Sequence, residues 1–454
     1  MDQMTALVQS INSWLWGITG LIPLLVGVGI YFTFRLNFVQ IRKFGQAMRF
    51  TFHGLSLHGE RAGKAGMTSF QSLATAVAAQ VGTGNIAGAA TAIAMGGPGA
   101  IFWMWIAAFF GMATIFSEAV LAQLFKTHDD KGHVTGGPAY YITNGLHCKP
   151  LAVFFSIAII LALGFIGNMV QSNSIAVAFT SAFDIAPLYT GLAIAGLAAF
   201  IFFGGLGRIA STTEKLVPIM AVIYIIGSIV IICMNADQII PAFKMIFVGA
   251  FDPSAATGGI IGAGVKEAMR YGVARGLFSN EAGMGSTPHA HAVAKVQHPA
   301  QQGMVALCGL FIDTFIVLNM TALVIFTTGV LDGKTTGIEL AQKAFTAGFG
   351  ALGNPFVAVC LLFFAFSTIV GWYFFAEQNA KFLFGTKVLP FFRILVMCFL
   401  CLGAMLKVDL VWELADMFNG LMVIPNLLAL VGLSKLVAKA LNDYDPSFPV
   451  KVKK

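Results

Sequence analysis

The polar residues with the clearest chemical meaning lie inside an otherwise apolar stretch, residues 68–97. The run from Gln80 to Asn85 reads QVGTGN and places two glycines beside a glutamine, a threonine and an asparagine. Glycine destabilises a helix, and main-chain N–H and C=O groups here would lose their helical partners. Each such group costs several kcal/mol in hydrocarbon, so it persists only where a ligand, an ion or neighbouring protein binds it.

An interrupted helix of this kind suits a ligand that carries both a negative and a positive charge. The half-helix that starts near Asn85 points its positive end at the gap, which favours a carboxylate, and the last carbonyls of the preceding half favour a cation. A zwitterion with a small cation fits such a gap. A second stretch, residues 258–296, offers the same chemistry between Gly276 and Pro288, where the sequence reads GLFSNEAGMGSTP.

Close helix packing is an alternative explanation for part of the first stretch. Small residues at positions 84, 88, 92 and 96 repeat every four residues, which is typical of helices that pack without a ligand. From Gly88 onward, packing explains this pattern as well as binding does. Packing does not require Gln80, Thr83 and Asn85 together, so we interpret the run 82–85 as a binding segment.

Two adjacent hydroxyls, Ser367 and Thr368, lie in the apolar run LLFFAFSTIVGWYFF. They could bond their own backbone four residues back, as hydroxyls in membrane helices often do. Beside carbonyls freed by a broken helix they would instead complete an oxygen shell for a hard cation such as sodium. Trp372 lies one turn beyond Thr368 and could form the wall of a small pocket.

Further polar residues occur within apolar runs. Asn168 and Gln171 are three residues apart and therefore share one helical face. Asp313 lies in the run GLFIDTFIVLN, and a carboxylate deep in a membrane usually has a function. We therefore treat Asp313, Asn168 and Glu281 as candidates for gating or coupling.

Four other ionisable residues are better explained by structure than by function. Glu118 and Glu377 lie toward the ends of predicted spans, which favours ion pairing. His289 and His291 are two residues apart, so on a helix they point in different directions and make a poor metal pair.

The chain that must position these residues has 454 residues, of which 57% are hydrophobic and 10% charged. Soluble proteins carry roughly 25% charged residues, so the composition indicates a membrane protein and excludes large catalytic or receptor domains outside the bilayer. The basic residues behind the net charge of +7 lie in short loops, where membrane topology explains them better than nucleic-acid binding. At about 20 residues per span, we predict eleven transmembrane helices near 14–35, 67–95, 98–125, 151–182, 187–205, 214–234, 258–294, 303–328, 355–385, 388–406 and 412–436.

The charges and cysteines add two expectations. Basic residues concentrate in the loop after the first span and in the tail after the last, which places both in the cytoplasm. With an odd number of spans, the N-terminus is then outside. The six cysteines include one CxxC spacing, Cys398 and Cys401, but it lies within an apolar span, so neither a disulfide framework nor a zinc site is predicted.

Each polar stretch is followed by four conventional apolar spans, so the chain after its first helix divides into five plus five. Because five is odd, the second set must cross the membrane in the opposite sense, as an inverted repeat with a broken first helix in each half. We predict an all-α membrane protein with the following parts: an N-terminal extra helix and cytoplasmic loop (1–66), a first five-helix repeat (67–235), an extracellular connection (236–257), a second five-helix repeat (258–436) and a cytoplasmic tail (437–454).

Three runs of the sequence resemble the signatures of the alanine or glycine:cation symporter family, also called sodium:alanine symporters. They are GTGNIAGAATAIAMGGPGAIFWMW (82–105), THDDKGHVTGGPAYYI (127–142) and RGLFSNEAGMGSTPHAHA (275–292). The resemblance covers essentially the whole chain. It implies a sodium-coupled importer of small neutral amino acids in a prokaryotic cytoplasmic membrane, built on the LeuT scaffold with one extra helix. Sodium would be the coupling ion, with no organic cofactor.

The resemblance also implies roles for individual residues. The carbonyls of Ala78 and Val81 would bind sodium together with the hydroxyls of Ser367 and Thr368. A second sodium would use Asn85 and Asn319, although the local sequence VLNMTALV departs from the expected Cys/Thr-rich version. Val273 and Leu277, four residues apart, would limit the size of the substrate side chain. The remaining substrate ligands would be Gln80, Thr83, Gly84, Asn85, Gln171 and Trp372.

Three other functions are compatible with parts of the sequence. The same fold could be driven by protons, with Asp313 or Glu281 titrating. An intramembrane hydrolase could use Ser279 or Ser286 with His289, but the sequence has no GxSxG elbow. A channel fits less well, since a single-chain repeat predicts an occluded site rather than a symmetric pore. The sequence gives no indication of the oligomeric state or of which neutral amino acid is preferred.

Overall fold

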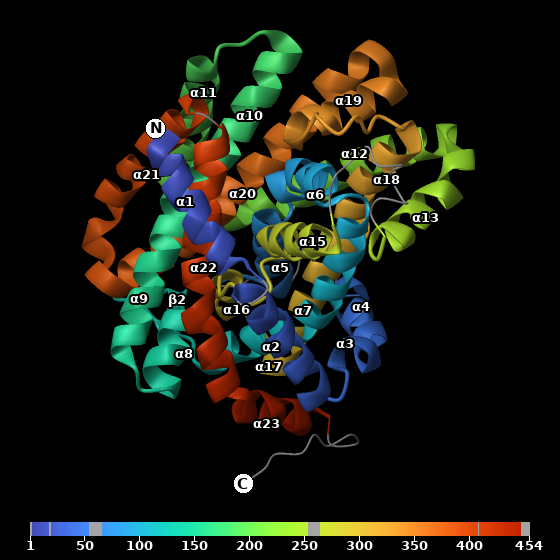
Figure 1. Ribbon diagram of the computed structural model, residues 1–454. Helices are drawn as coiled ribbons and strands as arrows, with labels where there is room; N and C mark the ends of the chain where they lie inside the picture. The colour runs from blue at the N-terminus through green and yellow to red at the C-terminus, as the bar shows by residue number, and fades with distance from the viewer. Residues whose placement is uncertain (1, 18–19, 54–65, 253–263, 407, 446–454) are drawn as a thin grey trace.

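Helices form nearly all of the first half of the chain, as Figure 1 shows. The structure is a computed structural model that describes residues 2–17, 20–53, 66–252, 264–406 and 408–445. Two segments in this half, η1 and η2, are π-helical, and η3 is a short 3-10 turn. The elements are α1 (Asp2–Leu15), α2 (Leu21–Arg35), α3 (Val39–Arg42), α4 (Phe44–His53), α5 (Ser69–Gln80), η1 (Gly84–Gly88), α6 (Ala89–Gly96), α7 (Gly99–Leu124), β1 (Thr127–His128), β2 (Val134–Thr135), α8 (Pro138–Gly145), α9 (Lys149–Ile159), η2 (Ile160–Gly167), α10 (Asn168–Phe183), α11 (Pro187–Phe202), α12 (Gly205–Met234), η3 (Ala236–Gln238) and α13 (Ile239–Gly249).

The described residues of the second half form helices joined by loops. This half contains one further π-helical segment, η4, and the 3-10 turns η5 and η6. The elements are α15 (Val265–Asn280), α16 (Pro288–Ala292), α17 (Pro299–Leu310), η4 (Phe311–Leu318), α18 (Asn319–Thr328), α19 (Gly337–Phe349), η5 (Gly350–Leu352), α20 (Gly353–Phe384), η6 (Thr386–Val388), α21 (Leu389–Met405), α22 (Val408–Gly432) and α23 (Ser434–Tyr444).

The helices support a membrane protein but do not confirm the predicted number of spans. Within the described ranges, 7 helices are long and apolar enough to cross a membrane, and α2 and α11 are shorter apolar helices. The predicted span 14–35 is divided between α1 and α2. The predicted spans 67–95 and 258–294 are interrupted, so neither forms a long helix, and residues 258–263 lie outside the described part.

Local sequence explains where the first interrupted helix begins and ends. At its start the Thr68 hydroxyl accepts from the amide of Gln71, 3.0 Å away, and the Gln71 side chain accepts from the amide of Thr68. This capping box satisfies two of the amides that a helix start leaves free. The helix α5 ends at Gln80 because Val81 has φ −81° and ψ 88°, outside the helical region.

The second interrupted helix ends on a left-handed residue. Glu281 has φ +60°, which stops α15 at Asn280. The loop that follows also takes left-handed conformations at Gly283 (φ +86°) and Gly285 (φ +79°), where glycine has no steric penalty. Pro288 then starts α16, as proline often does at a first helical position. Both interruptions predicted from the sequence are therefore present.

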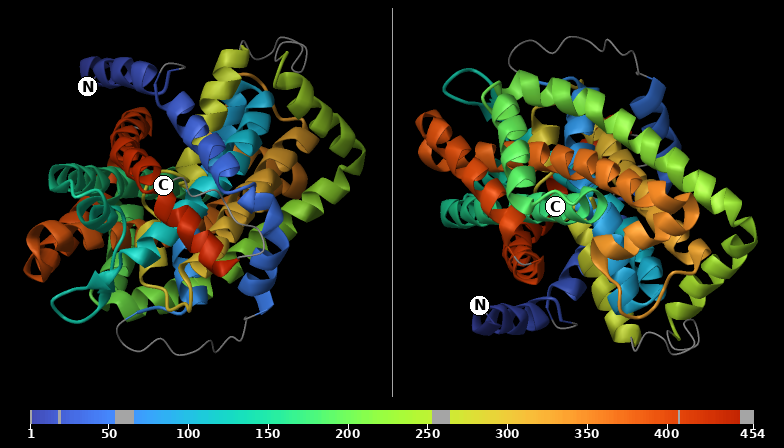
Figure 2. Two further views of the ribbon diagram at one scale, coloured as in Figure 1. Left: turned by 90° about the horizontal axis from the view of Figure 1, so that it is seen from below. Right: turned by 90° about the horizontal axis from the view of Figure 1, so that it is seen from above.

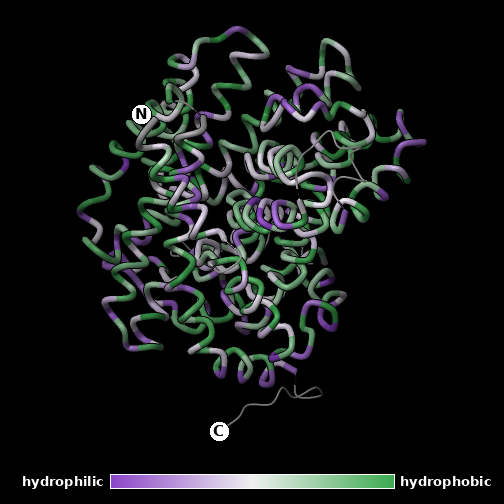
Figure 3. Tube along the Cα trace, in the orientation of Figure 1, coloured by the Kyte–Doolittle hydropathy of each residue, from purple (hydrophilic) through white to green (hydrophobic). Residues whose placement is uncertain are grey.

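The two interrupted helices lie at the centre of the molecule. The helix α15 packs against α7, α6 and η1, while α5 packs against α12, α17 and α20. Figure 3 shows α15 as a hydrophilic ring inside a mostly hydrophobic bundle. Figure 2 shows α12 running alongside α20, which the contacts between these helices confirm. The second half of α15, Gly272–Asn280, is thus buried among apolar helices, whereas its first residues, Val265 and Lys266, are exposed.

Candidate substrate and cation site

The first break exposes main-chain amides that nearby side chains bind. The amide of Gly82 donates to Asn85 Oδ1 at 3.0 Å, and the amide of Thr83 donates to Gln171 Oε1 at 3.3 Å. Asn85 therefore reaches back to the break that precedes its own half-helix, and Gln171 reaches the same point from α10. This explains why asparagine and glutamine accompany the two glycines in an otherwise apolar stretch.

Four oxygen atoms from α5, its end and α20 gather beside this break. Thr368 Oγ1 lies 2.9 Å from the carbonyl oxygen of Ala78 and 3.5 Å from that of Val81. Ser367 Oγ lies 3.2 Å from the carbonyl oxygen of Ala78. Both hydroxyls also lie within reach of the Phe364 carbonyl one turn back. If both hydroxyls donated to the Phe364 carbonyl, their lone pairs would face the carbonyls of Ala78 and Val81. Carbonyl and hydroxyl oxygens are the ligands that hard cations prefer.

Gly82 is packed tightly between this cluster and α10. A Cβ atom on Gly82 would lie 2.2 Å from Thr368 Oγ1 and 3.2 Å from Gln171 Oε1. Gly84 is similarly close to α15, since a Cβ atom there would lie 3.0 Å from Ser279 Cα. The glycines at 82 and 84 therefore have two roles: they interrupt the helix, and they allow α20 and α15 to approach the backbone closely.

Two buried polar atoms near the first break have no hydrogen-bond partner. Gln80 Nε2 donates to the carbonyl of Asn280 at 2.7 Å, but Gln80 Oε1 has no partner, and neither does Thr83 Oγ1. Both side chains are almost completely buried. A buried polar atom without a partner costs roughly 1–3 kcal/mol, so these two atoms retain unused hydrogen-bonding capacity beside the break.

Asp313 connects the two breaks. Its carboxylate accepts from Asn85 Nδ2 at 2.7 Å, from Ser279 Oγ at 3.0 Å and from Thr314 Oγ1 at 2.8 Å. Asn85 follows the first break, and Ser279 precedes the second. The carboxylate is completely buried, and the three donors named are all neutral. The sequence singled out Asp313 but gave no indication of Ser279 as its partner.

For the amino-acid uptake that the resemblance implies, we expect Asp313→Asn to lower kcat/KM by about 10- to 100-fold. The substitution keeps the shape but replaces one acceptor oxygen by an NH2 donor, so the donors around Asp313 lose an acceptor, and a buried polar group left without a partner costs roughly 1–3 kcal/mol. Uptake of labelled alanine into proteoliposomes would measure the effect. Asp332→Asn, at an exposed aspartate that pairs with Lys343, is the matched control, and equal uptake by the two variants would contradict a role for Asp313.

The loop of the second break is held by Glu118, which sequence analysis assigned to ion pairing. This assignment is wrong, because the Glu118 carboxylate accepts from the amides of Gly283 and Gly285 at 3.1 and 2.9 Å and from Asn426 Nδ2 at 2.7 Å. The ion pairing predicted for Glu377 is present, with Lys381 at 3.2 Å and Arg393 at 3.5 Å.

Trp372 and Glu281 contact each other at the second break. The indole Nε1 of Trp372 donates to the Glu281 carboxylate, which also accepts from the Ser286 hydroxyl at 2.5 Å. The Trp372 ring lies against Gly167, at the end of η2, where a Cβ atom would lie 2.7 Å from it. Trp372 thus lies between α10 and the second break, one turn from the oxygen cluster.

Three residues predicted for the site lie elsewhere. Val273 and Leu277 line a small cavity of about 20 Å³ with residues of α2 and α7 and with Asn280 and Ala282 of the second break, whereas Ser279 is the residue of α15 that meets Gly84. Asn319 Oδ1 accepts from Trp105 Nε1 at 2.7 Å, so Asn319 is not paired with Asn85.

Other residues fill the places that the sequence left open. Thr321 rather than Asn319 reaches the first break, with its hydroxyl donating to the Asn85 carbonyl at 2.6 Å and lying beside Tyr224. Asn168 donates to the Gly164 carbonyl of its own helix at 3.2 Å and lies in the helix that carries Gln171. Thr321 lies with Asn319 in the run VLNMTALV, the span in which the resemblance placed a ligand for a second sodium.

The arrangement does not support a serine hydrolase. Ser279 Oγ donates to Asp313, and Ser286 Oγ donates to Glu281. His289 Nδ1 contacts the Ser286 carbonyl oxygen at 2.7 Å rather than the hydroxyl, and its Nε2 meets Asn379. Neither serine therefore has a histidine base, and His289 has the structural role that the sequence predicted.

The run 127–142 forms a hairpin and a helix next to the second break. Gly137 packs against the His289 ring, where a Cβ atom would lie 2.6 Å away, and Tyr141 donates to Asn426. In the hairpin, burial acts to raise the pKa of Asp129, but amide bonds from His133 and Lys131 and the nearby Lys381 outweigh it and lower that pKa. The run thus supports α16 and the loop before it.

Comparison with known proteins finds one family along nearly the whole chain. The model of the sodium:alanine symporter family matches residues 1–453. The protein named "Sodium/alanine symporter AgcS" of Methanococcus maripaludis is 44% identical over 449 residues, covering 96% of this chain and 97% of that protein. The protein named "Probable sodium/glutamine symporter GlnT" of Bacillus subtilis is 42% identical over 435 residues, covering 95% and 89%.

A solved structure shows the same fold at low sequence identity. The crystal structure of MhsT in complex with L-phenylalanine has a TM-score of 0.58 at 13% identity and covers 85% of this chain and 100% of that one. The fold is therefore LeuT-like, and the chain is an integral membrane transporter rather than an enzyme. The chain belongs to the sodium:alanine symporter family.

Proposed function

We propose that the protein is a sodium-coupled symporter that imports a small neutral amino acid, alanine or glycine, by alternating access. The observation that carries this proposal is the cluster of four oxygens from Ala78, Val81, Ser367 and Thr368 at the end of α5. Sodium bound there would hold α20 against the break and fix the backbone that the substrate needs.

The substrate would bind on the other side of the same break. Its carboxylate would take the amides of Gly82 and Thr83, which the side chains of Asn85 and Gln171 hold in this structure. The unpartnered oxygens of Gln80 and Thr83 would accept from its ammonium group. Trp372 would close the site beside Gly167, and this limited space favours a small side chain.

The proposed arrangement of the chain in the membrane is the one predicted from the sequence. Residues 67–235 and 258–436 would form the two inverted five-helix repeats around the site, with the N-terminus outside and the C-terminus in the cytoplasm. In Figure 1, α1 begins near the top of the molecule and α23 lies at the bottom, in keeping with termini on opposite sides. Low cytoplasmic sodium would empty the oxygen cluster and release the substrate inward.

We expect uptake into proteoliposomes to require an inward sodium gradient and to rise when the inside is made negative. Each charge that enters with the substrate gains about 2.3 kcal/mol per 100 mV, which corresponds to about 50-fold accumulation. Labelled alanine, with a valinomycin-induced potassium potential and a panel of competing amino acids, would measure both coupling and preference. Undiminished uptake without sodium would contradict the proposal.

A proton-coupled amino-acid transporter on the same fold is the second candidate. Its support is that Asp313 and Glu281 are fully buried and that the hydrogen-bond donors described for them are neutral. A pH gradient in sodium-free buffer separates the two. Alanine uptake driven by that gradient would favour protons, whereas uptake driven only by sodium would favour the oxygen cluster.

A further inference from the structure

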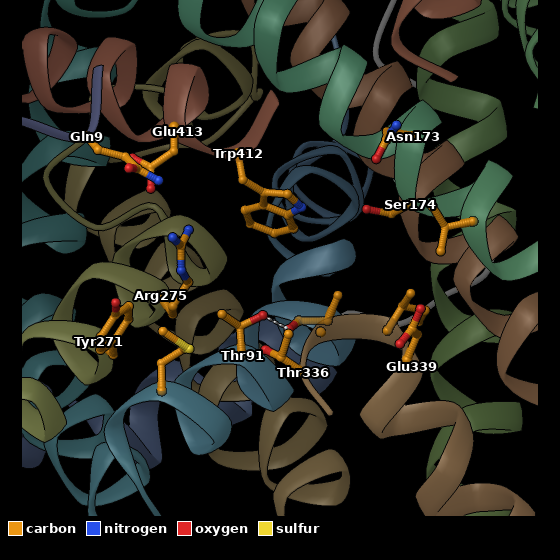
Figure 4. A pocket seen from close by; sticks show the side chains of 15 residues that line it. Gln9, Thr91, Asn173, Ser174, Tyr271, Arg275, Thr336, Glu339, Trp412 and Glu413 are labelled. Carbon is orange, nitrogen blue, oxygen red and sulfur yellow. Dashed lines mark hydrogen bonds between the residues drawn. The ribbon is translucent and has the colours of Figure 1, made fainter. Parts of the chain in front are cut away.

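Two cavities in the described part of the chain differ in charge. The larger one, of about 440 Å³ and shown in Figure 4, has two glutamates and one arginine as its charged lining residues. The smaller one, of about 280 Å³, has more basic than acidic side chains, and we call it the basic cavity. Its charged lining residues are Lys131, Lys381, Arg393, Asp129 and Glu377. Of the two, the basic cavity is the one that suits an anion.

The basic cavity lies where three connections between helices meet. It is bounded by the hairpin of β1 and β2, by the turn between α11 and α12, and by the corner between α20 and α21. The topology predicted from the sequence places all three of these connections in the cytoplasm. The basic cavity therefore lies at the cytoplasmic ends of membrane helices.

The acidic side chains of the basic cavity are buried, whereas the basic ones reach its surface. The side chains of Asp129 and Glu377 are 7% and 5% exposed. Those of Lys381 and Arg393 are 12% and 15% exposed, and Lys131 is an exposed residue of the hairpin. A ligand that enters the basic cavity therefore meets mainly cationic groups.

The basic side chains retain donors that a ligand can use. Within the described residues, the Lys131 ammonium group forms no ion pair. Arg393 directs Nε to Tyr373 at 3.0 Å and Nη2 to Glu377 at 3.5 Å, and among the described contacts this leaves Nη1 for another acceptor. Lys381 has three donors and two acidic neighbours, at 3.2 and 3.8 Å. Lysine and arginine are common ligands of phosphate oxygens.

Exposed aromatic rings adjoin the basic cavity. Phe203, which directly precedes the glycines at 204 and 205 that line the cavity, is 54% exposed, and the Arg393 guanidinium lies 5.6 Å from the centre of its ring. Phe200 is 68% exposed, and the Arg208 guanidinium lies 4.4 Å from the centre of its ring. Apolar rings with arginine heads directed to water are typical of the end of a membrane helix. The basic cavity thus borders the region of the lipid headgroups.

We propose that the basic cavity binds the phosphate headgroup of an anionic phospholipid from the cytoplasmic leaflet. Lys131, Lys381 and Arg393 bind the phosphate oxygens, and the acyl chains lie along the exposed rings of Phe200 and Phe203. Basic pockets between membrane helices on the cytoplasmic side typically bind such headgroups. The bound lipid connects the hairpin, the turn between α11 and α12, and the corner between α20 and α21. The site is independent of the transported substrate and of its coupling ion.

The modest charge of the basic cavity favours a lipid over a soluble phosphate. Three basic and two acidic side chains, with His133 neutral, give the lining a net charge of +1, which attracts a free ion only weakly. A lipid in the same leaflet is held beside the cavity by its acyl chains. Its headgroup is therefore present at a high effective concentration, and a modest attraction is sufficient.

Native mass spectrometry of the purified full-length protein in detergent, titrated with dioleoylphosphatidylglycerol, tests the proposal. We expect one molecule of this lipid to stay bound at concentrations at which dioleoylphosphatidylcholine, whose headgroup has no net charge, does not. Lys131→Gln should weaken this binding by about fivefold, as expected for one basic side chain near an anionic lipid.

Lys334→Gln is the matched control and should leave the affinity for the lipid unchanged. Lys131 and Lys334 are both exposed, and the amide of each donates to the side chain of an aspartate two residues earlier at 2.9 Å. Lys334 lies in a loop that the predicted topology places outside the cell. The two substitutions therefore remove the same charge from similar turns on opposite sides of the membrane.

Three results would overturn the proposal. They are equal retention of the two lipids, equal affinity of Lys131→Gln and Lys334→Gln for phosphatidylglycerol, and displacement of the lipid by glycerol 3-phosphate at the same concentration, which would make the cavity a site for soluble phosphate. If Lys131→Gln melted at a lower temperature than the unmodified protein without lipid, Lys131→Arg would decide, because it keeps the charge. Lipid binding retained in Lys131→Arg supports the proposal, and lipid binding lost there contradicts it.

Discussion

Gly82→Ala should abolish sodium-dependent uptake, while Gly88→Ala in the same segment should leave it nearly unchanged. A Cβ atom on Gly82 would lie 2.2 Å from Thr368 Oγ1, whereas the nearest atom to one on Gly88 is a main-chain oxygen at 3.8 Å. The first distance is far below a normal contact, and the second is an ordinary one. Both substitutions add one methyl group to a glycine, so a difference in uptake between them would show that Gly82 has no room for a side chain.

The collision at Gly82 cannot be relieved without damage to the site. Thr368 is β-branched and sits within α20, where its χ1 angle has few allowed values. If its hydroxyl turned away, the cation cluster would lose an oxygen; if it stayed, α5 and α20 would have to separate. Sodium-dependent alanine uptake, with surface expression measured in parallel, should fall to background for Gly82→Ala. Retention of half or more of the uptake would contradict our assignment of this break.

Thr368→Val should raise the sodium concentration for half-maximal uptake by about 10- to 100-fold. Valine keeps the shape of threonine but removes the oxygen that lies near the carbonyls of both Ala78 and Val81. Loss of one polar interaction at a buried site costs roughly 1–3 kcal/mol. Uptake rates at a series of sodium concentrations, with constant ionic strength, would measure the shift.

Thr327→Val is the matched control for this experiment. The hydroxyl of Thr327 bonds to carbonyls of its own helix, the nearer being that of Leu323 at 2.7 Å. Its loss should leave the sodium dependence unchanged. If both variants behaved alike, or if Thr368→Val changed only the maximal rate, the oxygen cluster would not be the sodium site.

The sequence predicted the two breaks well because their cause is local. Glycines at 82 and 84 and polar groups at 80, 83 and 85 have no place in a lipid-facing helix, and the charges in the second stretch exclude it from lipid in the same way. The helix ends found at Gln80 and Asn280 follow these signals. The resemblance to a known family then indicated Ser367 and Thr368, which the structure places against the first break.

Residues that depend on long-range packing could not be predicted. Glu118 meets Asn426 across 308 positions of the chain, and nothing in a single sequence connects them. Asn319 was implied by the resemblance rather than by spacing, and the structure gives it other partners, because it accepts from Trp105 Nε1 and donates to the Phe315 carbonyl. Thr321, two residues further along, contacts the first break instead.

The contacts of Glu118 have a consequence for how the protein opens. Tyr141 on α8 donates to Asn426 on α22, Asn426 donates to Glu118, and Glu118 accepts from the loop at Gly283 and Gly285. The members of this chain of bonds are buried, so separating them would expose unpaired polar atoms to an apolar interior. We therefore expect the loop at Gly283 and Gly285, α8 and the middle of α22 to move as one rigid unit during transport. The residues that bend would then lie outside this unit.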